Sequence, residues 1–155
     1  MMNKVKSVGF VFSLALIGGL THAQEPLTKP ITALFDAMRA HQGEVLKAQF
    51  TPSAVLQRAK SDGTVTTNDI ERFASAISNS TKILDEQLLA IKSHRSGNLA
   101  SVWTPYVFYV DGKLSHCGVN SFQLVQNDGR WKIHYLIDNM FSGDCTAFIT
   151  SHKRD

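Results

Sequence analysis

The fold of this chain is decided by Ser101–Asp138, SVWTPYVFYVDGKLSHCGVNSFQLVQNDGRWKIHYLID. Within it, Asp111-Gly112 and Asp128-Gly129 each separate two runs of aromatic and β-branched residues. An Asp-Gly pair in that setting is the strongest short-range signal for a β-hairpin, because both residues adopt the backbone of a two-residue turn. The stretch therefore predicts three antiparallel strands joined by two tight turns.

The pattern changes on the N-terminal side of these strands. Pro30–Phe50 has apolar residues at helical spacing, which predicts an amphipathic helix with a break near Gly43. A small hairpin is expected around Asp62-Gly63, and a short helix from Asn68. The four strands expected after it are Lys82–Ser93, Leu99–Val110, Lys113–Gln126 and Arg130–Met140. Helices first and an antiparallel meander last predict an α+β fold, a curved antiparallel sheet wrapped around the N-terminal helices.

The first residues have the pattern of a secretory signal peptide. Lys4 and Lys6 precede an apolar run, Val8–Leu20, which is too short to span a bilayer comfortably. We expect cleavage after Ala23, and the alternative is an uncleaved N-terminal anchor. The expected divisions are a signal peptide at 1–23, a linker at 24–29, one domain at 30–145 and a flexible tail at 146–155. The mature protein is then periplasmic or secreted, and it has no membrane contact after cleavage.

Composition argues against several classes of partner. The chain has 16 Lys and Arg against 13 Asp and Glu. Because Lys4 and Lys6 leave with the signal peptide, the positive excess falls from three to one, which indicates neither nucleic acid nor an anionic membrane as a partner. The sequence has no phosphate-binding loop, no dinucleotide motif and no metal-ligand spacing, so we expect no cofactor and no metal.

Cys117 and Cys145 are the two cysteines of the chain. An exported protein permits a disulfide, and Gly143 would let the chain turn back towards Cys117 after the last strand. The alternative is two buried free thiols. We expect the disulfide.

Tight turns set the pairing register of hairpins, so the residues on each face of the meander are predictable. Two-residue turns place Trp103 opposite Asn120, and Phe122 opposite Tyr135. The predicted inner face carries Leu84, Glu86, Leu88, Trp103, Val107, His116, Asn120, Phe122, Leu124, Ile133, Tyr135 and Ile137. A mostly apolar face with a few polar groups is typical of a small-molecule pocket, and equally of a core packed under helices.

Four segments of the sequence resemble the nuclear transport factor 2-like superfamily, and within it the SnoaL-like, lumazine-binding branch of bacterial proteins. They are Leu99–Tyr106, Tyr109–Lys113, Ser115–Phe122 and Trp131–Ile133. The resemblance implies a cone-shaped α+β fold with a pocket between sheet and helices, often dimeric through the outer face of the sheet. It leaves the activity open, because the superfamily includes isomerases, dehydratases, cyclases and many non-catalytic binding domains.

His116 is the first candidate for chemistry in this pocket. In catalytic members of the superfamily, acid and base residues project from strands into the cone, and His116 and Glu86 are predicted to take such places. A neutral imidazole acts as acid, base or ligand donor near neutral pH, and Glu86 on the same row would orient it or share a proton. The alternative is a core histidine bonded to backbone or to Asn120.

The other predicted ligand-binding residues are Trp103, Asn120, Phe122 and Tyr135. Trp103 and Tyr135 would stack on a flat ligand, and Asn120 would bond a ligand carbonyl. Each of them has an alternative role in the core. Asp138, by the same register, is expected on the outer face as a surface acid.

The outer face is predicted to carry an apolar stripe, formed by Val102, Tyr106, Phe108, Val119 and Leu136. Such a patch indicates an interface, so we expect a homodimer through this face. Three functions follow. The first is an exported small-molecule-binding domain; the second is a general acid/base lyase or isomerase that uses His116. The third is a non-catalytic dimeric interaction module whose cone is a filled core.

Overall fold

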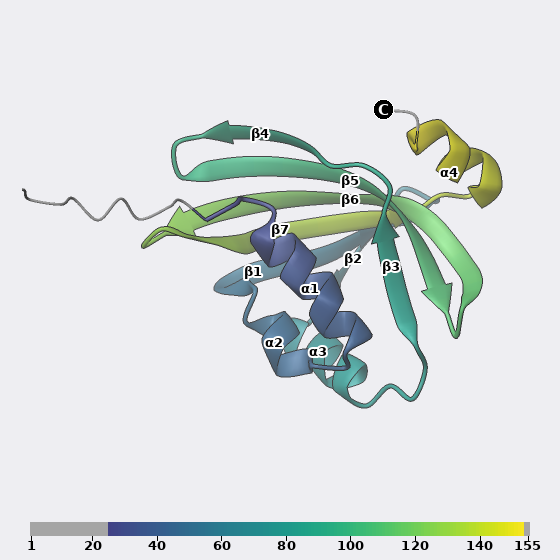
Figure 1. Ribbon diagram of the computed structural model, residues 1–155, viewed down its shortest axis with the longest axis horizontal. Coiled ribbons are helices and arrows are strands. Elements are labelled where there is room, and N and C mark those ends of the chain that lie inside the picture. The colour runs from purple at the N-terminus through teal and green to yellow at the C-terminus, as the bar shows by residue number, and fades with distance from the viewer. Residues whose placement is uncertain (1–24, 154–155) are drawn as a thin grey trace, which may run out of the picture.

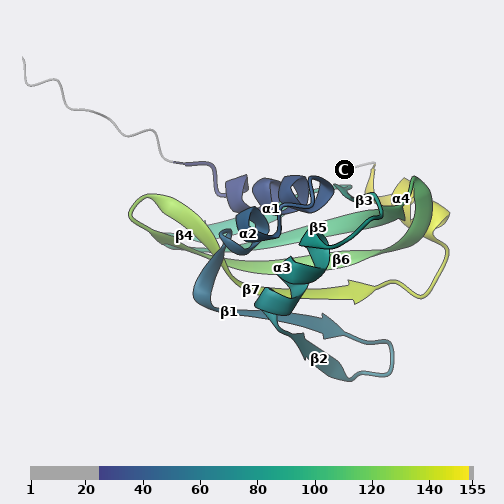
Figure 2. The same cartoon turned by 90° about the horizontal axis from the view of Figure 1, so that it is seen from below.

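Helices α1–α3 cover one face of a curved, unclosed sheet, and α4 lies apart from them at the far end of that sheet (Figures 1 and 2). This computed structural model describes residues 25–153, so the predicted signal peptide at 1–23 lies outside the described residues. The elements are α1 (Lys29–Arg39), α2 (Gly43–Lys47), β1 (Phe50–Ala59), β2 (Val65–Asn68), α3 (Ile70–Ser78), β3 (Leu84–Leu88), β4 (Lys92–Ser96), β5 (Leu99–Val110), β6 (Lys113–Asn127), β7 (Arg130–Met140) and α4 (Cys145–His152). The predicted α+β class and the curved antiparallel sheet are confirmed.

The sheet has the strand order β2-β1-β7-β6-β5-β3, and β4 also pairs with β5. Its pairs are antiparallel except β1 with β7, which run parallel. The predicted single strand at Lys82–Ser93 is wrong, because it divides into β3 and β4. Both parts pair with β5, and Leu89 donates to the carbonyl of Pro105 between them. The division lets β3 turn away from the direction of β4, as Figure 1 shows.

The helices begin and pack where local chemistry allows. α3 starts after Asp69, whose carboxylate accepts a 2.7 Å hydrogen bond from the backbone N–H of Arg72, one residue later than the expected start. The predicted break in the first helix is confirmed, with α2 beginning at Gly43. A Cβ at Gly43 would lie 2.1 Å from the carbonyl oxygen of Ala74, so glycine is what lets α2 lie this close to α3.

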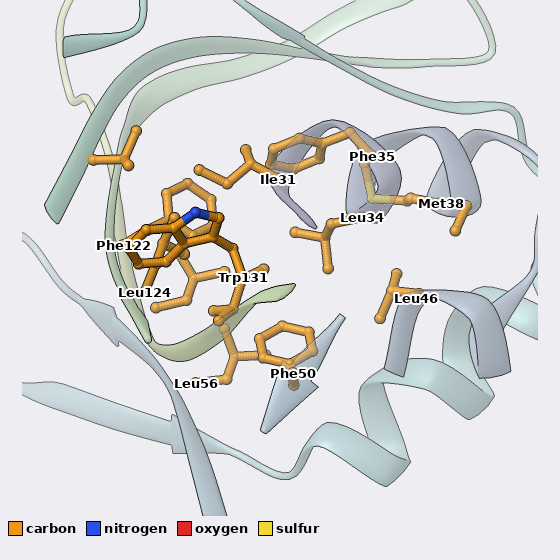
Figure 3. Close-up of a cluster of buried hydrophobic side chains, with 14 of the residues drawn as sticks. Ile31, Leu34, Phe35, Met38, Leu46, Phe50, Leu56, Phe122, Leu124 and Trp131 are labelled. Carbon is orange, nitrogen blue, oxygen red and sulfur yellow. The ribbon is translucent and has the colours of Figure 1, made fainter. Parts of the chain in front are cut away.

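The core lies between α1, α2 and the concave face of the sheet, and Figure 3 shows its centre. Phe35 of α1 meets Phe122 of β6 edge-on, with 6.4 Å between ring centroids. Ile31, Leu124 and Ile133 are fully buried beside them. Burial of aliphatic side chains of this size stabilises the fold by roughly 1.5–3 kcal/mol each.

The end of the chain is tied to the outer face of the sheet. Cys117 of β6 and Cys145 of α4 form a disulfide, with 5.7 Å between their Cα atoms. Asp144 caps α4 by accepting from the N–H of Thr146, and Phe148 packs on Phe141. The expected flexible tail is therefore wrong for residues 146–152, because a disulfide, an N-cap and an aromatic contact hold them in a helix.

The predicted pairing register is wrong by one residue over most of the meander. Phe108 of β5 pairs with His116 of β6, and the next residue of β5, Tyr109, pairs with Leu114. Ser115 therefore has no partner in β5 and is an extra residue in β6. His134 is likewise extra in β7. A bulge of this kind reverses the face of every residue beyond it.

The shift at Ser115 overturns the predicted outer stripe on β5, and the one at His134 overturns it on β7, so that Val119 alone keeps its expected side. Val102 and Tyr106 lie on the concave side and are buried within the chain, where the Tyr106 hydroxyl donates to the carbonyl of Asn139 at 3.0 Å. Phe108 and Leu136 line a pocket on the concave side. The stripe is not an outer surface, and the predicted homodimer loses this support.

Candidate functional site

A pocket of about 610 Å³ lies between the concave face of the sheet and helices α1 and α3. Most of its wall is apolar, formed by Leu34, Phe35, Met38, Leu56, Phe73, Ala76, Ile77, Leu84, Phe108 and Leu136. The polar side chains of its wall are Arg58, Thr67, Asn68, Asp69, Arg72, Glu86, His116, Asn120 and Asp138. A concave wall that combines apolar side chains with convergent polar groups is typical of a small-molecule site.

Glu86 and Asn120 are bonded to each other in this pocket. The Asn120 side-chain amide, which is 4% exposed, donates to the Glu86 carboxyl at 2.6 Å. Burial raises the pKa of Glu86 to about 8, against the effect of the Asn120 hydrogen bond and with a contribution from the negative charge of Asp138. The carboxyl is therefore mostly protonated at neutral pH.

Arg39 holds the strand that carries Glu86. Its guanidinium, at the end of α1, donates to the Glu86 backbone carbonyl and to the Asp85 carboxylate, both at 3.0 Å. A second ion pair ties Arg39 to Asp36 at 2.6 Å. These contacts join β3 to α1 behind the pocket and set the position of Glu86 relative to the helix.

Arg58 and Asp138 form an ion pair inside the pocket. Arg58 Nε lies 3.0 Å from both carboxylate oxygens, and Nη2 donates to Oδ2 as well. The two residues are direct neighbours in the parallel β1–β7 pairing, and the Asp138 side chain is 13% exposed. The hydrogen bonds to Asp138 raise the pKa of Arg58. The expected place of Asp138 on the outer face is wrong, because the extra residue at His134 turns it inward.

His116 lies on the same row as Glu86, with Phe108 of β5 between them. Its ring packs against Phe108 and edge-on against Tyr106, at centroid distances of 5.0 and 5.7 Å. Nδ1 lies 3.1 Å from the Ser115 hydroxyl, and among residues 25–153 Nε2 has no hydrogen-bond partner. Burial, with the positive charge of Arg58, lowers the pKa of His116, so the imidazole is neutral at pH 7.

The predicted site residues divide into two groups. Glu86, His116 and Asn120 line the pocket. Trp103, Phe122 and Tyr135 are absent from its lining. The register shift puts Trp103 opposite Ser121 on the outer face, where it is 50% exposed.

Phe122 and Tyr135 also lie elsewhere. Phe122 is buried in the core against Phe35. Tyr135, displaced by the extra residue at His134, donates from its hydroxyl to Gln57 Oε1 at 2.6 Å. Neither side chain reaches the pocket.

The sequence does not predict Arg58 and Asp138 as pocket residues, nor the polar side chains that Thr67, Asn68, Asp69 and Arg72 add to the lining. The sequence predicts a hairpin that contains Arg58 but no strand beside it. Its parallel partner, β7, carries Asp138, and a parallel pairing has no local sequence signal.

Two negative findings hold for the described part of the chain. Residues 25–153 contain no group of three or more His, Cys, Asp or Glu side chains able to hold a metal ion. No helix within the same residues is long and apolar enough to cross a membrane.

Solved structures share this architecture over about three quarters of the chain. A Mycobacterium tuberculosis protein of unknown function is similar over 81% of this chain and 83% of its own, with 15% identity and a TM-score of 0.64. A Shewanella baltica protein described as nuclear transport factor 2-like is similar over 76% and 92%, with 13% identity and a TM-score of 0.56. This chain has the nuclear transport factor 2-like fold. A proposed dehydratase of that family from Streptomyces avermitilis is similar over 74% and 93%, with 16% identity and a TM-score of 0.61.

Sequence comparison adds nothing to this fold assignment, since neither a family model nor a curated protein matches the chain. The resemblance to the nuclear transport factor 2-like superfamily is confirmed in the fold. The SnoaL-like branch is consistent with it and stays a prediction. Identities of 13–16% carry no information about activity.

Proposed function

We propose that this protein binds a small organic molecule in the pocket between the sheet and helices α1 and α3. Its volume of about 610 Å³ lies within the roughly 300–1,000 Å³ typical of ligand sites. The observation that carries the proposal is that the Glu86–Asn120 pair lines this pocket. A buried polar pair needed only for packing would be sealed by neighbouring side chains. The pocket also argues against the alternative of a filled cone.

Export is part of the proposal. The signal-peptide pattern that ends at Ala23 supports it, and so does the disulfide between Cys117 and Cys145, since disulfides persist in oxidising compartments. The protein would then meet its ligand in the periplasm or outside the cell.

A general acid/base lyase or isomerase is the second candidate function. The observation that favours it is the pairing of two groups on one row, a carboxyl that is protonated at neutral pH and an imidazole that is neutral. Glu86 would donate a proton while His116 accepted one. Two of the similar structures are described as proposed dehydratases, one of them of scytalone.

Binding is tested with 2-acetylnaphthalene as the probe, followed by amide chemical shifts in NMR spectra of the labelled protein. We expect shifts at Glu86, His116 and Asn120. Leu84→Trp, which fills the apolar wall, should abolish them, whereas Leu114→Trp, an exposed position outside the pocket, should not. Shifts confined to the face of Trp103, or none at all, would refute the proposal.

Catalysis is tested on the same probe. A base near the bound carbonyl would exchange the methyl protons of 2-acetylnaphthalene with D₂O, which proton NMR follows directly. The acid/base candidate predicts exchange faster than in buffer and its loss in His116→Ala. Exchange at the rate of buffer alone would leave binding as the function.

A further inference from the structure

We propose that the pocket selects an uncharged carbonyl compound, whose oxygen accepts a hydrogen bond from the Glu86 carboxyl, and that it rejects carboxylates and other anions. This inference rests on the proposed function, because it names the class of ligand for the same pocket. It follows from which polar groups of the pocket are already engaged and which are left for a ligand.

The charge of Arg58 in the pocket is already paired with a carboxylate. Arg58 uses Nε and Nη2 on Asp138, and Nη1 lies 3.6 Å from the sulfur of Met140. An anion that entered would meet the Asp138 carboxylate beside the same guanidinium. Arg72 is the other cation of the lining, but its side chain is exposed at the start of α3, where water and salt screen its charge.

The Glu86 carboxyl, in contrast, has a free position. One of its oxygens, Oε1, accepts from Asn120, and among residues 25–153 the other has no hydrogen-bond partner. With the pKa of Glu86 at about 8, this second oxygen carries a proton at neutral pH and donates. A carbonyl oxygen satisfies that donor, whereas an apolar ligand leaves it unpaired.

The same geometry makes binding depend on pH. The ionisable groups that face Glu86 come from five elements: Arg39 on α1, Arg58 on β1, Tyr106 on β5, His116 on β6 and Asp138 on β7. Both arginines are held by other carboxylates, Arg39 by Asp36 and Asp85 and Arg58 by Asp138. Ionisation of Glu86 therefore removes the proton that the carboxyl would donate to a ligand, and it adds an unpaired negative charge to the pocket.

Three naphthalenes of similar size test the selection: 2-acetylnaphthalene, which is neutral with a carbonyl, 2-naphthoate, which is an anion, and 2-ethylnaphthalene, which has no acceptor. Dissociation constants are measured by NMR titration of the full mature chain. At about pH 6 we expect 2-acetylnaphthalene to bind roughly tenfold or more tightly than either analogue, since one satisfied hydrogen bond is worth about 1.4 kcal/mol. Its affinity should fall as pH rises through about 8.

Two variants assign the effect to Glu86. Glu86→Gln keeps a neutral donor, so its affinity for 2-acetylnaphthalene should no longer fall at high pH. Glu86→Leu removes the donor and should erase the preference over 2-ethylnaphthalene. Glu71→Gln, on the exposed surface of α3, is the matched control and should behave as the unmodified protein. Thermal unfolding of each variant checks that it is folded.

The outcomes separate this inference from the proposed function. Binding of 2-naphthoate in the pocket as tightly as 2-acetylnaphthalene would overturn the selection and leave small-molecule binding intact. A preference for the ketone that survives Glu86→Leu would overturn the role of Glu86. Failure of all three probes to bind would remove the proposed function itself, and the selection with it.

Discussion

The Asn120 amide on β6 reaches across β5 to donate a 2.6 Å hydrogen bond to Glu86 on β3. This bond joins two strands that do not pair with each other, and it lies in the wall of the pocket. The hydrogen bond holds the Glu86 carboxyl where burial disfavours its ionised form. The properties of the site therefore depend on the protonation state of one residue.

Glu86→Gln should change how stability depends on pH. The folded-state pKa of about 8 lies above the usual 4.5, so between these values the folded chain binds more protons than the unfolded chain. The free energy of unfolding therefore falls as pH rises through this window, by at most about 1.4 kcal/mol per pH unit. Glu86→Gln has no carboxyl to ionise, so its stability should not fall in this way. Urea unfolding should give near-equal stability for the variant and the unmodified protein at about pH 5, and a more stable variant at about pH 9. Parallel curves for variant and unmodified protein would contradict the assignment.

Asn120→Leu should destabilise the fold by about 1–3 kcal/mol, because it leaves the partly buried Glu86 carboxyl without its donor. It should also raise the pKa of Glu86 further, since the hydrogen bond from Asn120 lowers it. Urea unfolding measures the first effect. A double-mutant cycle with Glu86→Leu is the control: the two costs should not add, and full additivity would show that the residues are energetically independent.

Arg58→Met should cost about 1–3 kcal/mol of unfolding free energy, because it strands the mostly buried Asp138 carboxylate. Arg58→Met combined with Asp138→Leu should recover most of that loss. Arg72→Met, at an exposed position of the same pocket, is the control and should stay within about 0.5 kcal/mol of the unmodified protein. An equal loss of unfolding free energy in Arg58→Met and Arg72→Met would mean that the Arg58–Asp138 pair contributes nothing specific to stability.

Replacing both Cys117 and Cys145 with alanine should lower the unfolding free energy by about 3 kcal/mol, since the disulfide closes a separation of 28 residues. Because α4 lies at the outer face, 2-acetylnaphthalene binding should persist at a temperature where the variant is folded. A reductant should lower the unfolding free energy of the unmodified protein and leave that of the double variant unchanged. Loss of binding in the folded double variant would show that the disulfide also shapes the pocket.

Much of the fold could be predicted because its signals are local. Asp-Gly turns at 111–112 and 128–129 place both residues of each hairpin turn, and the structure has positive φ at all four. A turn sets the register only up to the next irregularity, however. Ser115 and His134 are extra residues within long strands, and nothing in their own identity marks a bulge.

These two bulges explain why several of the site predictions are wrong. Trp103 and Tyr135 lie beyond them and turned to the outer face, whereas Asp138 turned inward. Glu86 stayed on the row of His116 because its own pairing with β5 also differs by one residue from the expected one. Arg58 was out of reach of any local argument, since its place depends on the parallel pairing of β1 with β7.

The protonation state of Glu86 is measured most directly by carbon-13 NMR of its side-chain carboxyl, titrated in the folded protein with Glu86→Gln used to assign the resonance. The pocket described here predicts a single transition near pH 8, and a carboxyl still protonated at neutral pH. A transition near the ordinary value of 4.5 would mean that Glu86 is an anion in the working protein. It could not then donate to a ligand carbonyl, and the proposed selection of neutral ligands would be wrong.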